Sequence, residues 1–465
     1  MQISILSGIY TDEESDIRTA FPLNLIPVPG KNGVSNGYLR PADGLVQFGT
    51  GPGIDRGGIN WNDVCYRVMG TKLVSISEAG VSTVLGDVGG VGQVSLTYST
   101  DLLAIASGGN LFYWDGATLT QVTDVDLGVV LDVMFVDGYF MTTDGTNLVV
   151  TDLNNPLAVD PFKYGSAEVD PDPLLAVAKL RNEVHAIGRY TIEVFQNVGG
   201  AVFPFQRING GHIRKGSIGT HSNCIFLNTI AFLGSGKEES PSIYLGDSAT
   251  AARIATREID LILQEYTEEQ LSKVVLEAKV DKGHNLLLIH LSDRTLVYDA
   301  SATGAFDRPV WFVLGSELNG GQYRAKNLVW CYDKWLFGDP QAARHGFLST
   351  SLSSHYGEII GWEFGTQIIY TEGKGAIIHD LELVALPGRV ELGKEPKIST
   401  SFSLDGETWS QEIYIDAGKI GNRTKRIVWF KQGFIRNWRI QRFRGTSDVR
   451  LSIARLEAFV EALNG

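Results

Sequence analysis

The chain has 465 residues, of which 53 are glycine and 15 are proline, and charged residues make up 20% of it. This abundance of turn-forming residues without matching polarity excludes a collagen-like repeat, a coiled coil and an intrinsically disordered chain. The net charge of −13 at pH 7 argues against a protein whose whole surface wraps nucleic acid.

The three cysteines, Cys65, Cys224 and Cys331, are scattered and form no C-x-x-C pair. We therefore expect free thiols in a reducing compartment, and neither a disulfide framework nor a zinc site. No stretch approaches the roughly 18 uninterrupted apolar residues of a membrane span, and the first residues lack a basic region followed by an apolar one. We expect a soluble protein without an export signal.

Residues 1–58 are expected to form an extended N-terminal arm that lies on another surface. Prolines fall among many glycines there, and the segment offers little apolar sequence for a core of its own. The prolines are Pro22, Pro27, Pro29, Pro41 and Pro52.

Residues 59–355 predict a β-propeller. Short apolar runs separated by Gly, Asp-Gly or Asn-containing breaks recur roughly every 35 to 45 residues, the spacing of propeller blades. Strands of the first three units are expected at 64–69, 73–77, 81–85, 102–106, 111–114, 118–122, 133–136, 139–142 and 148–150, and further units at 175–197, 229–254, 276–314 and 328–350. The units are degenerate, so the sequence leaves the number of blades open.

Asp-Gly occurs in three of the predicted turns, at residues 115–116, 137–138 and 144–145. Between β-branched or aromatic runs, Asp-Gly indicates a type I′ hairpin turn, which needs positive φ at both central residues. The units therefore form meanders. Because one blade cannot bury both of its faces alone, neighbouring blades must stack around an axis.

A short helical insertion is expected near residues 257–278. Apolar residues recur there at helical intervals, and Thr267-Glu268-Glu269-Gln270 has the form of a capping box. We expect two short helices that meet near Tyr266 and connect two units along the side of the propeller.

Residues 356–465 are expected to form a C-terminal antiparallel β-sandwich-like domain. Strands of alternating polarity, typical of sheets with one solvated face, are expected at 358–362, 380–386, 397–404, 426–430, 438–443 and 450–459. The predicted fold class is thus all-β, a propeller followed by a sandwich-like domain.

The sequence offers no motif for catalysis, metal binding or a cofactor. The eight histidines are scattered, with no H-E-x-x-H and no pair three to five residues apart. It contains neither a G-x-x-x-x-G-K-[ST] loop nor a G-x-S-x-G elbow. We predict no catalytic residue and no metal ligand.

The segment 403–409 resembles the S-x-D-x-G-x-T-W Asp box of sialidase-type propellers, one residue short. In those families the box stabilises a turn far from the catalytic site: Asp and Ser bind the turn backbone while the Trp packs beneath. We expect a structural hairpin built on Ser403, Asp405, Gly406 and Trp409. A glycosidase would also need two carboxylates about 5 to 9.5 Å apart.

Basic residues concentrate towards the C-terminal end. Residues 416–465 carry eleven Lys and Arg against four Asp and Glu, a net charge of +7, which leaves −20 on residues 1–415. Arginines interleaved with aromatic residues suit phosphates or an acidic protein face. We favour an assembly interface over DNA, with solvated strand faces as the alternative. The candidate interface residues are Arg436, Trp438, Arg439, Arg442 and Arg444.

Several stretches carry a family resemblance when they are read in order. They are 38–40, 64–68, 88–95, 252–256, 265–269, 286–291, 296–301 and 381–383 ahead of 403–409. Together they resemble the packaged-DNA stabilization protein of short-tailed bacteriophages (podoviruses), also called the tail hub or nozzle. The resemblance spans about residues 20–450.

The resemblance implies a structural, non-enzymatic late protein of the virion tail, assembled in the host cytoplasm as a homo-hexamer below the portal and its adaptor, the head-to-tail completion protein. The tail needle and tailspikes would attach to the same assembly. The ring would close the exit channel after packaging and conduct double-stranded DNA during ejection, without sequence-specific binding or membrane insertion. It also implies a propeller in each copy.

Two hypotheses extend this interpretation. Acidic or neutral channel walls would keep DNA from adhering, because DNA binds Lys and Arg through counterion release. Six-fold closure needs a head-to-tail interface, and residues 1–58 could cross it or reach the adaptor.

The alternative function is a glycan-binding or glycan-cleaving propeller, suggested by the Asp-box-like hairpin and nine tryptophans. A bacterial propeller scaffold is a third possibility.

Overall fold

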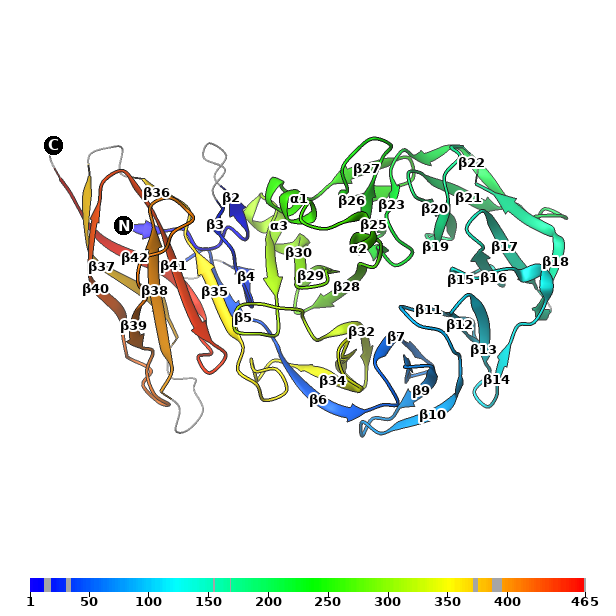
Figure 1. The fold of residues 1–465 in the computed structure, drawn as a ribbon, viewed down its shortest axis with the longest axis horizontal. Helices are drawn as coiled ribbons and strands as arrows, with labels where there is room; N and C mark the ends of the chain where they lie inside the picture. Colours follow the sequence, from blue (N-terminus) through cyan, green and yellow to red (C-terminus); the bar gives the residue numbers. More distant parts are fainter. Residues whose placement is uncertain are drawn as a thin grey trace. The chain divides into compact units, whose positions relative to one another are not determined.

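The computed structural model describes residues 1–11, 18–30, 35–153, 155–167, 169–370, 375–386 and 395–463. The chain divides into two compact units (Figure 1). Unit 1 comprises residues 1–46, 280–323 and 349–465, and unit 2 comprises residues 47–279 and 324–348.

Among its described residues, unit 2 contains six antiparallel sheets, most of them four-stranded meanders. With strands in spatial order, the first sheet is β10 (Ser82–Asp87), β9 (Lys72–Ile76), β8 (Val64–Met69) and β7 (Asp55–Trp61), and the second is β11 (Ser95–Tyr98), β12 (Leu103–Ser107), β13 (Asn110–Trp114) and β14 (Leu119–Gln121). The third is β15 (Asp132–Val136), β16 (Tyr139–Thr143), β17 (Asn147–Asp152) and β18 (Asn155–Ser166), and the fourth is β19 (Leu174–Leu180), β20 (Glu183–Gly188), β21 (Ile192–Asn197) and β22 (Phe205–Ile213). The fifth is β23 (Gly216–Ser217), β25 (Thr229–Ser235), β26 (Ser242–Asp247) and β27 (Thr250–Arg253), with β24 (Asn223–Phe226) also paired with β25, and the sixth is β32 (Lys326–Cys331), β33 (Lys334–Gly338), β34 (Arg344–Ser349) and β6 (Gly44–Thr50). The 3-10 helix η1 is Val125–Leu127.

One strand from each of these sheets contacts the corresponding strand of the next sheet around a ring. Contacts join β32 to β7, β7 to β11, β11 to β15, β15 to β19, and β19 to β24. The seventh member is β28 (Val275–Asp281), where the N–H of Leu276 donates to the carbonyl of His221 at 3.0 Å. The carboxylate of Glu277 in β28 accepts the N–H groups of Asn327 and Leu328 at 2.8 and 2.6 Å, which closes the ring.

The strand positions agree with the predicted units, but the sheets have a fourth strand where three were expected. The strands β7 and β18 supply it in the first and third sheets. Because β6 and β7 begin before residue 59, the sheets include residues that the sequence analysis assigns to the arm. In β6, Phe48 packs edge-on against His345 and Phe347 of β34.

The Asp-Gly turns do not all have the predicted geometry. Only Asp137 and Gly138 both have positive φ, 49° and 89°, as a type I′ turn requires. In the other two turns the aspartate has an ordinary φ, and the Asp115 and Asp144 carboxylates accept main-chain N–H groups two and three residues further on. Side-chain capping stabilises these turns instead.

The helical insertion is present but shorter than predicted. Helix α1 is Arg257–Leu263 and α2 is Glu268–Ser272. Thr267 and Gln270 form the expected capping box, each binding the other's main-chain N–H. The predicted helical stretch to 278 is wrong beyond α2, because β28 begins at Val275.

Unit 1 contains a β-sandwich. One sheet orders β4 (Leu25–Pro29), β5 (Gly37–Pro41), β42 (Ile453–Ala462), β37 (Ala376–Ala385) and β40 (Ile427–Ile435), with β1 (Gln2–Ile3) on β42; the other orders β35 (Gly361–Gly365), β41 (Trp438–Thr446), β38 (Lys397–Ser403) and β39 (Ile413–Asp416), with β36 (Ile369–Tyr370) on β41. The unit also holds β2 (Tyr10–Thr11), β3 (Arg18–Ala20), β29 (His284–His290), β30 (Thr295–Asp299), α3 (Ala300–Phe306) and β31 (Trp311–Leu314). Trp429 and Leu381 of the first sheet share one core with Phe364 and Phe443 of the second.

The N-terminal residues take part in that sandwich. Leu25 and Leu39, in β4 and β5, are buried in its core, and β1 pairs with β42 through Ile3 and Leu456. Residues that we expected to have little core of their own therefore share the core of the C-terminal strands.

A buried ion pair joins the neighbouring strands β7 and β8 of unit 2. Arg67 Nε and Nη2 donate to the Asp55 carboxylate at 2.7 and 2.9 Å, and Nη2 also donates to the Asn327 carbonyl at 3.0 Å. Asn327 Nδ2 binds the same carboxylate at 2.7 Å, and its Oδ1 accepts Gln93 Nε2 at 2.6 Å. Burial alone would lower the pKa of Arg67, but the Asp55 carboxylate outweighs it and raises that pKa. The network ties β7, β8 and β32 together.

Removing the carboxylate should destabilise the protein strongly. Asp55→Asn leaves the guanidinium of Arg67 buried without its counter-charge, so we expect the free energy of unfolding to fall by about 3–5 kcal/mol. Urea titration followed by tryptophan fluorescence measures this change. Asp87→Asn, which removes an exposed pair with Lys72, is the matched control and should change stability little. Equal effects of the two substitutions would contradict the role of the buried pair.

Candidate functional site

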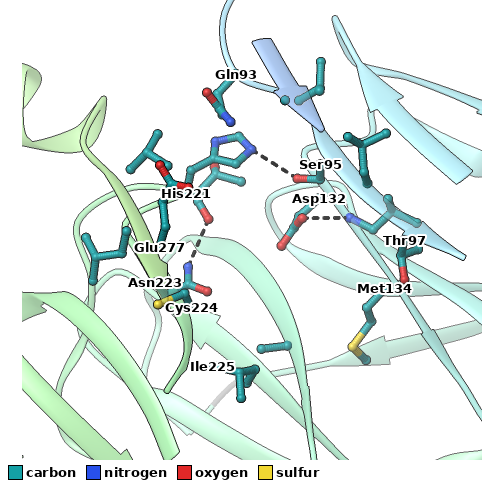
Figure 2. A pocket seen from close by; sticks show the side chains of 18 of the residues that line it. Gln93, Ser95, Thr97, Asp132, Met134, His221, Asn223, Cys224, Ile225 and Glu277 are labelled. Atoms are coloured by element: carbon teal, nitrogen blue, oxygen red, sulfur yellow. Dashed lines mark hydrogen bonds between the residues drawn. The ribbon is translucent and has the colours of Figure 1, made fainter. Parts of the chain in front are cut away.

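A cavity of about 470 Å³ lies at the centre of unit 2. Its wall includes residues of all seven strands of the ring, and Figure 2 shows its polar side chains. Strands β7, β11, β15, β19, β24, β28 and β32 each contribute, with Thr220 and His221 from the approach to β24. The cavity is therefore a product of the ring arrangement itself.

Three polar residues converge in this cavity (Figure 2). His221 Nε2 and Ser95 Oγ are 3.1 Å apart, and Asp132 lies beside Ser95. The Asp132 carboxylate accepts the main-chain N–H groups of Val133 and Val177, each at 2.9 Å. Burial raises the pKa of Asp132 to about 6 and lowers the pKa of His221 to about 4.

This arrangement is not that of a nucleophilic serine. Activation of a serine needs a basic histidine that a carboxylate orients. Here the serine lies between the histidine and the carboxylate, and a histidine with a pKa of about 4 is a weak base at neutral pH. Both oxygens of Glu277 are bound to main-chain N–H groups. The acidic side chains of the cavity thus serve to hold strands together.

In the part of the chain that the structure describes, no cluster of three or more His, Cys, Asp or Glu could hold a metal ion. Among the described helices, none is long and apolar enough to cross a membrane.

The structure does not bring the predicted interface residues together on one surface. Arg439 is fully buried, lies 4.2 Å over the ring of Phe402, and donates to Gln441 Oε1 and the Gln432 carbonyl. Burial lowers its pKa to about 10. Arg439 is therefore unavailable to a partner.

The other four predicted residues are accessible to different degrees. Arg442 and Arg444 are two residues apart in β41 and so share one face of the sheet. Arg444 pairs with Glu363 and Glu412, each at 3.1 Å, whereas Arg442 lies 4.0 Å over the ring of Trp409. At the turn before β41, Arg436 is exposed and Trp438 is half-buried.

The Asp-box-like segment forms a turn between β38 and β39. Asp405 Oδ1 accepts the N–H groups of Glu407 and Thr408 at 2.9 and 2.7 Å. Ser403 Oγ accepts the N–H of Gly406 at 2.8 Å, and Gly406 has a φ of 81°. The Thr408 hydroxyl also donates to the Asp405 carboxylate, and together with the N–H groups of Thr408 and Glu407 it holds the pKa of Asp405 far below its usual range. The segment lies in the sandwich of unit 1.

The sequence-based predictions included neither the residues that line the cavity nor the buried pair of Arg67 and Asp55. Arg67 carried a usable signal, because an arginine inside the apolar run Val64–Met69 needs a buried partner. Asn327 carried none: its importance comes from a left-handed φ of 57° and contacts with residues more than two hundred positions away.

Two family models match the chain in succession. The model described as Bacteriophage P22 Gp10, beta-propeller, covers residues 1–353, and the model described as Bacteriophage P22 Gp10, beta-sandwich, covers residues 361–461. The chain is 29% identical over 459 residues to the tail hub protein gp10 of Salmonella phage P22, with 94% of each sequence covered.

Solved structures resemble the chain more loosely. The N-terminal domain of Nup159 matches with a TM-score of 0.43 at 10% identity, covering 71% of this chain and 99% of that one. The Pan2 WD40 domain of Neurospora crassa matches with a TM-score of 0.42 at 8% identity, covering 66% and 96%. Neither similarity bears on function.

The titration of His221 gives a testable dependence of stability on pH. The pKa of His221 is about 4 in the folded protein, and we take the ordinary value of 6.5 for the unfolded chain. As the pH falls from 6.5 to 4, the unfolded state therefore takes up a proton that the folded state does not. The free energy of unfolding decreases in that pH range. Between pH 7 and 4.5, wild type should lose about 2 kcal/mol more unfolding free energy than His221→Gln.

Asp132→Asn provides the variant of opposite sign. The folded state of wild type takes up a proton on Asp132 near pH 6, before the unfolded state does, which offsets part of the loss. This variant should therefore lose more stability than wild type on acidification. Urea titrations at several pH values measure both effects, and parallel profiles for all three proteins would contradict the assignments.

Proposed function

The chain belongs to the Bacteriophage P22 Gp10 family, and from that premise we propose that it is a structural component of the tail hub of a short-tailed phage. The observation that carries this proposal is the ordered match of both family models, together with 94% coverage of a phage tail hub protein. The function is assembly, not catalysis. The cavity supports this, because its acidic side chains are bound to the main chain.

We further propose that six copies form a ring below the portal and its adaptor, with the needle and tailspikes attached to the same assembly. Closure of such a ring requires that one surface of each copy binds a different surface of the next. Arg436, Trp438, Arg442 and Arg444 remain candidates for contacts with neighbours.

The negative net charge of most of the chain is compatible with the wall of a channel through which DNA leaves the particle. Residues 1–415 carry a net charge of −20. Duplex DNA carries about one negative charge per 1.7 Å and binds basic surfaces tightly through counterion release. A wall without excess Lys and Arg would let DNA pass, and repulsion would act only within about 8 Å of it. Retention of the genome would then depend on protein that closes the bore.

The glycan-cleaving alternative receives no specific support from the site. The Asp-box-like turn is a backbone-binding device in the sandwich of unit 1, and all four of its predicted residues serve or adjoin that turn.

Virions assembled with and without the protein test the proposed function. We expect particles that lack it to package DNA but to release it during purification, and added wild-type protein to restore retention. Electron cryo-microscopy should place the protein on the axial exit path. Location away from that path, or release of reducing ends from host polysaccharide, would overturn the proposal.

A further inference from the structure

Three phenylalanines lie on the outward side of the first sheet of the sandwich. Phe430 and Phe434 in β40 and Phe459 in β42 are 70%, 51% and 62% exposed. The outward side of an antiparallel sheet is usually polar. These rings expose on the order of 350 Å² of apolar surface, comparable to the largest apolar patch of a typical monomer, which is often functional.

The strand register makes this surface continuous. Asp380 in β37 lies directly opposite both Phe430 and Phe459, and Ile377 lies opposite Phe434. Relative to β42, a bulge between Ile378 and Asp380 adds one residue to β37, His379, whose ring is 5.2 Å from that of Phe459. We call the surface formed by Phe430, Phe434, Phe459 and Asp380 the phenylalanine face.

Acidic groups flank the phenylalanine face. Two of them form ion pairs with arginines: Glu382 pairs with Arg426, and Glu457 pairs with Arg455. Asp380 lies at the centre of the face, between two phenylalanines, so the face combines aromatic rings with negative charge.

The outward side of the second sheet carries two arginines, of which Arg444 is paired with Glu363 and Glu412. Arg442 in β41 lies 4.0 Å over the ring of Trp409 and donates Nε to Ser401 Oγ. We call Arg442 and Trp409 the arginine face. Both sheets bury their inner sides in the one sandwich core, so their outward sides face away from each other.

We propose that the phenylalanine face of one copy binds the arginine face of a second copy. This proposal rests on the proposed hub function, because head-to-tail closure of a ring requires two different and complementary surfaces on each copy. Arginine and aromatic residues are enriched in the cores of interfaces, and a guanidinium is attracted to aromatic faces and carboxylates. Asp380 and Arg442 supply the matching charges.

Photocrosslinking in assembled particles tests which chain covers the phenylalanine face. Phe459→benzoylphenylalanine should give a product of two copies, with the crosslink mapped to β38, β41 or the turn that carries Trp409. A crosslink to another virion protein, a crosslink between two phenylalanine faces, or no crosslink in particles that contain the variant would each overturn the proposal.

Substitutions test the energetics. The double variant Phe430→Ser, Phe459→Ser should lower incorporation into particles about tenfold or more. The control Phe162→Ser removes a ring that is 78% exposed on β18 of unit 2, and should leave incorporation unchanged. Circular dichroism melts confirm that each variant folds. Equal incorporation of the double variant and the control would overturn the proposal.

A charge exchange completes the design. Asp380→Arg and Arg442→Glu should each weaken association of purified chains, measured by sedimentation velocity at low salt. The combined variant should restore association, because each interface again pairs opposite charges. Failure of the combined variant to recover would overturn the proposal. If wild-type protein is absent from virions, the proposed function fails, but sedimentation of these purified variants still decides whether the two faces bind.

Discussion

The ring of unit 2 depends on a guanidinium and a carboxylate that are both removed from water. A sheet that carries an arginine at its centre is stable only if the charge is matched, and Asp55 on the neighbouring strand matches it through two hydrogen bonds. Asn327 then binds the same carboxylate from β32, a strand distant in sequence. The requirement to satisfy one buried charge therefore makes the sheet of β7 and β8 a neighbour of the sheet of β32, which helps to close the ring around the central cavity.

Local signals in the sequence were sufficient for most strands of unit 2, because tight turns and apolar runs are encoded within a few residues. They were insufficient for β18, where Pro156 and Pro161 interrupt the alternation. An outermost strand tolerates proline, since its free edge needs no donor. Likewise Gly57 and Gly58 concealed β7, although the strand packs them closely against Val94 and Arg67.

The C-terminal arginines show why charge patterns identify a surface less reliably than they identify strands. Arg439 and Arg442 look equivalent in sequence, yet one lies beneath Phe402 inside the unit and the other covers Trp409 on its outside. Strand alternation assigns them to opposite sides, but only the packing of the two sheets decides which side faces water. Phe430 and Phe459 were not predicted as surface residues for the same reason, because the sequence does not distinguish an exposed aromatic residue from a buried one.

The pairing of β1 with β42 has a consequence for how the polypeptide matures. The main-chain carbonyl of Met1 accepts the N–H of Ala458, and the amino group of Met1 donates to the Ala458 carbonyl at 2.8 Å. During translation these opening residues have no strand to join until residues 453–462 have left the ribosome. Unit 2 meets no such delay for most of its sheets, whose strands are sequential hairpins. We therefore expect the meanders of unit 2 to fold first on the nascent chain. The sandwich is completed late, when β1 pairs with the sequence-distant β42.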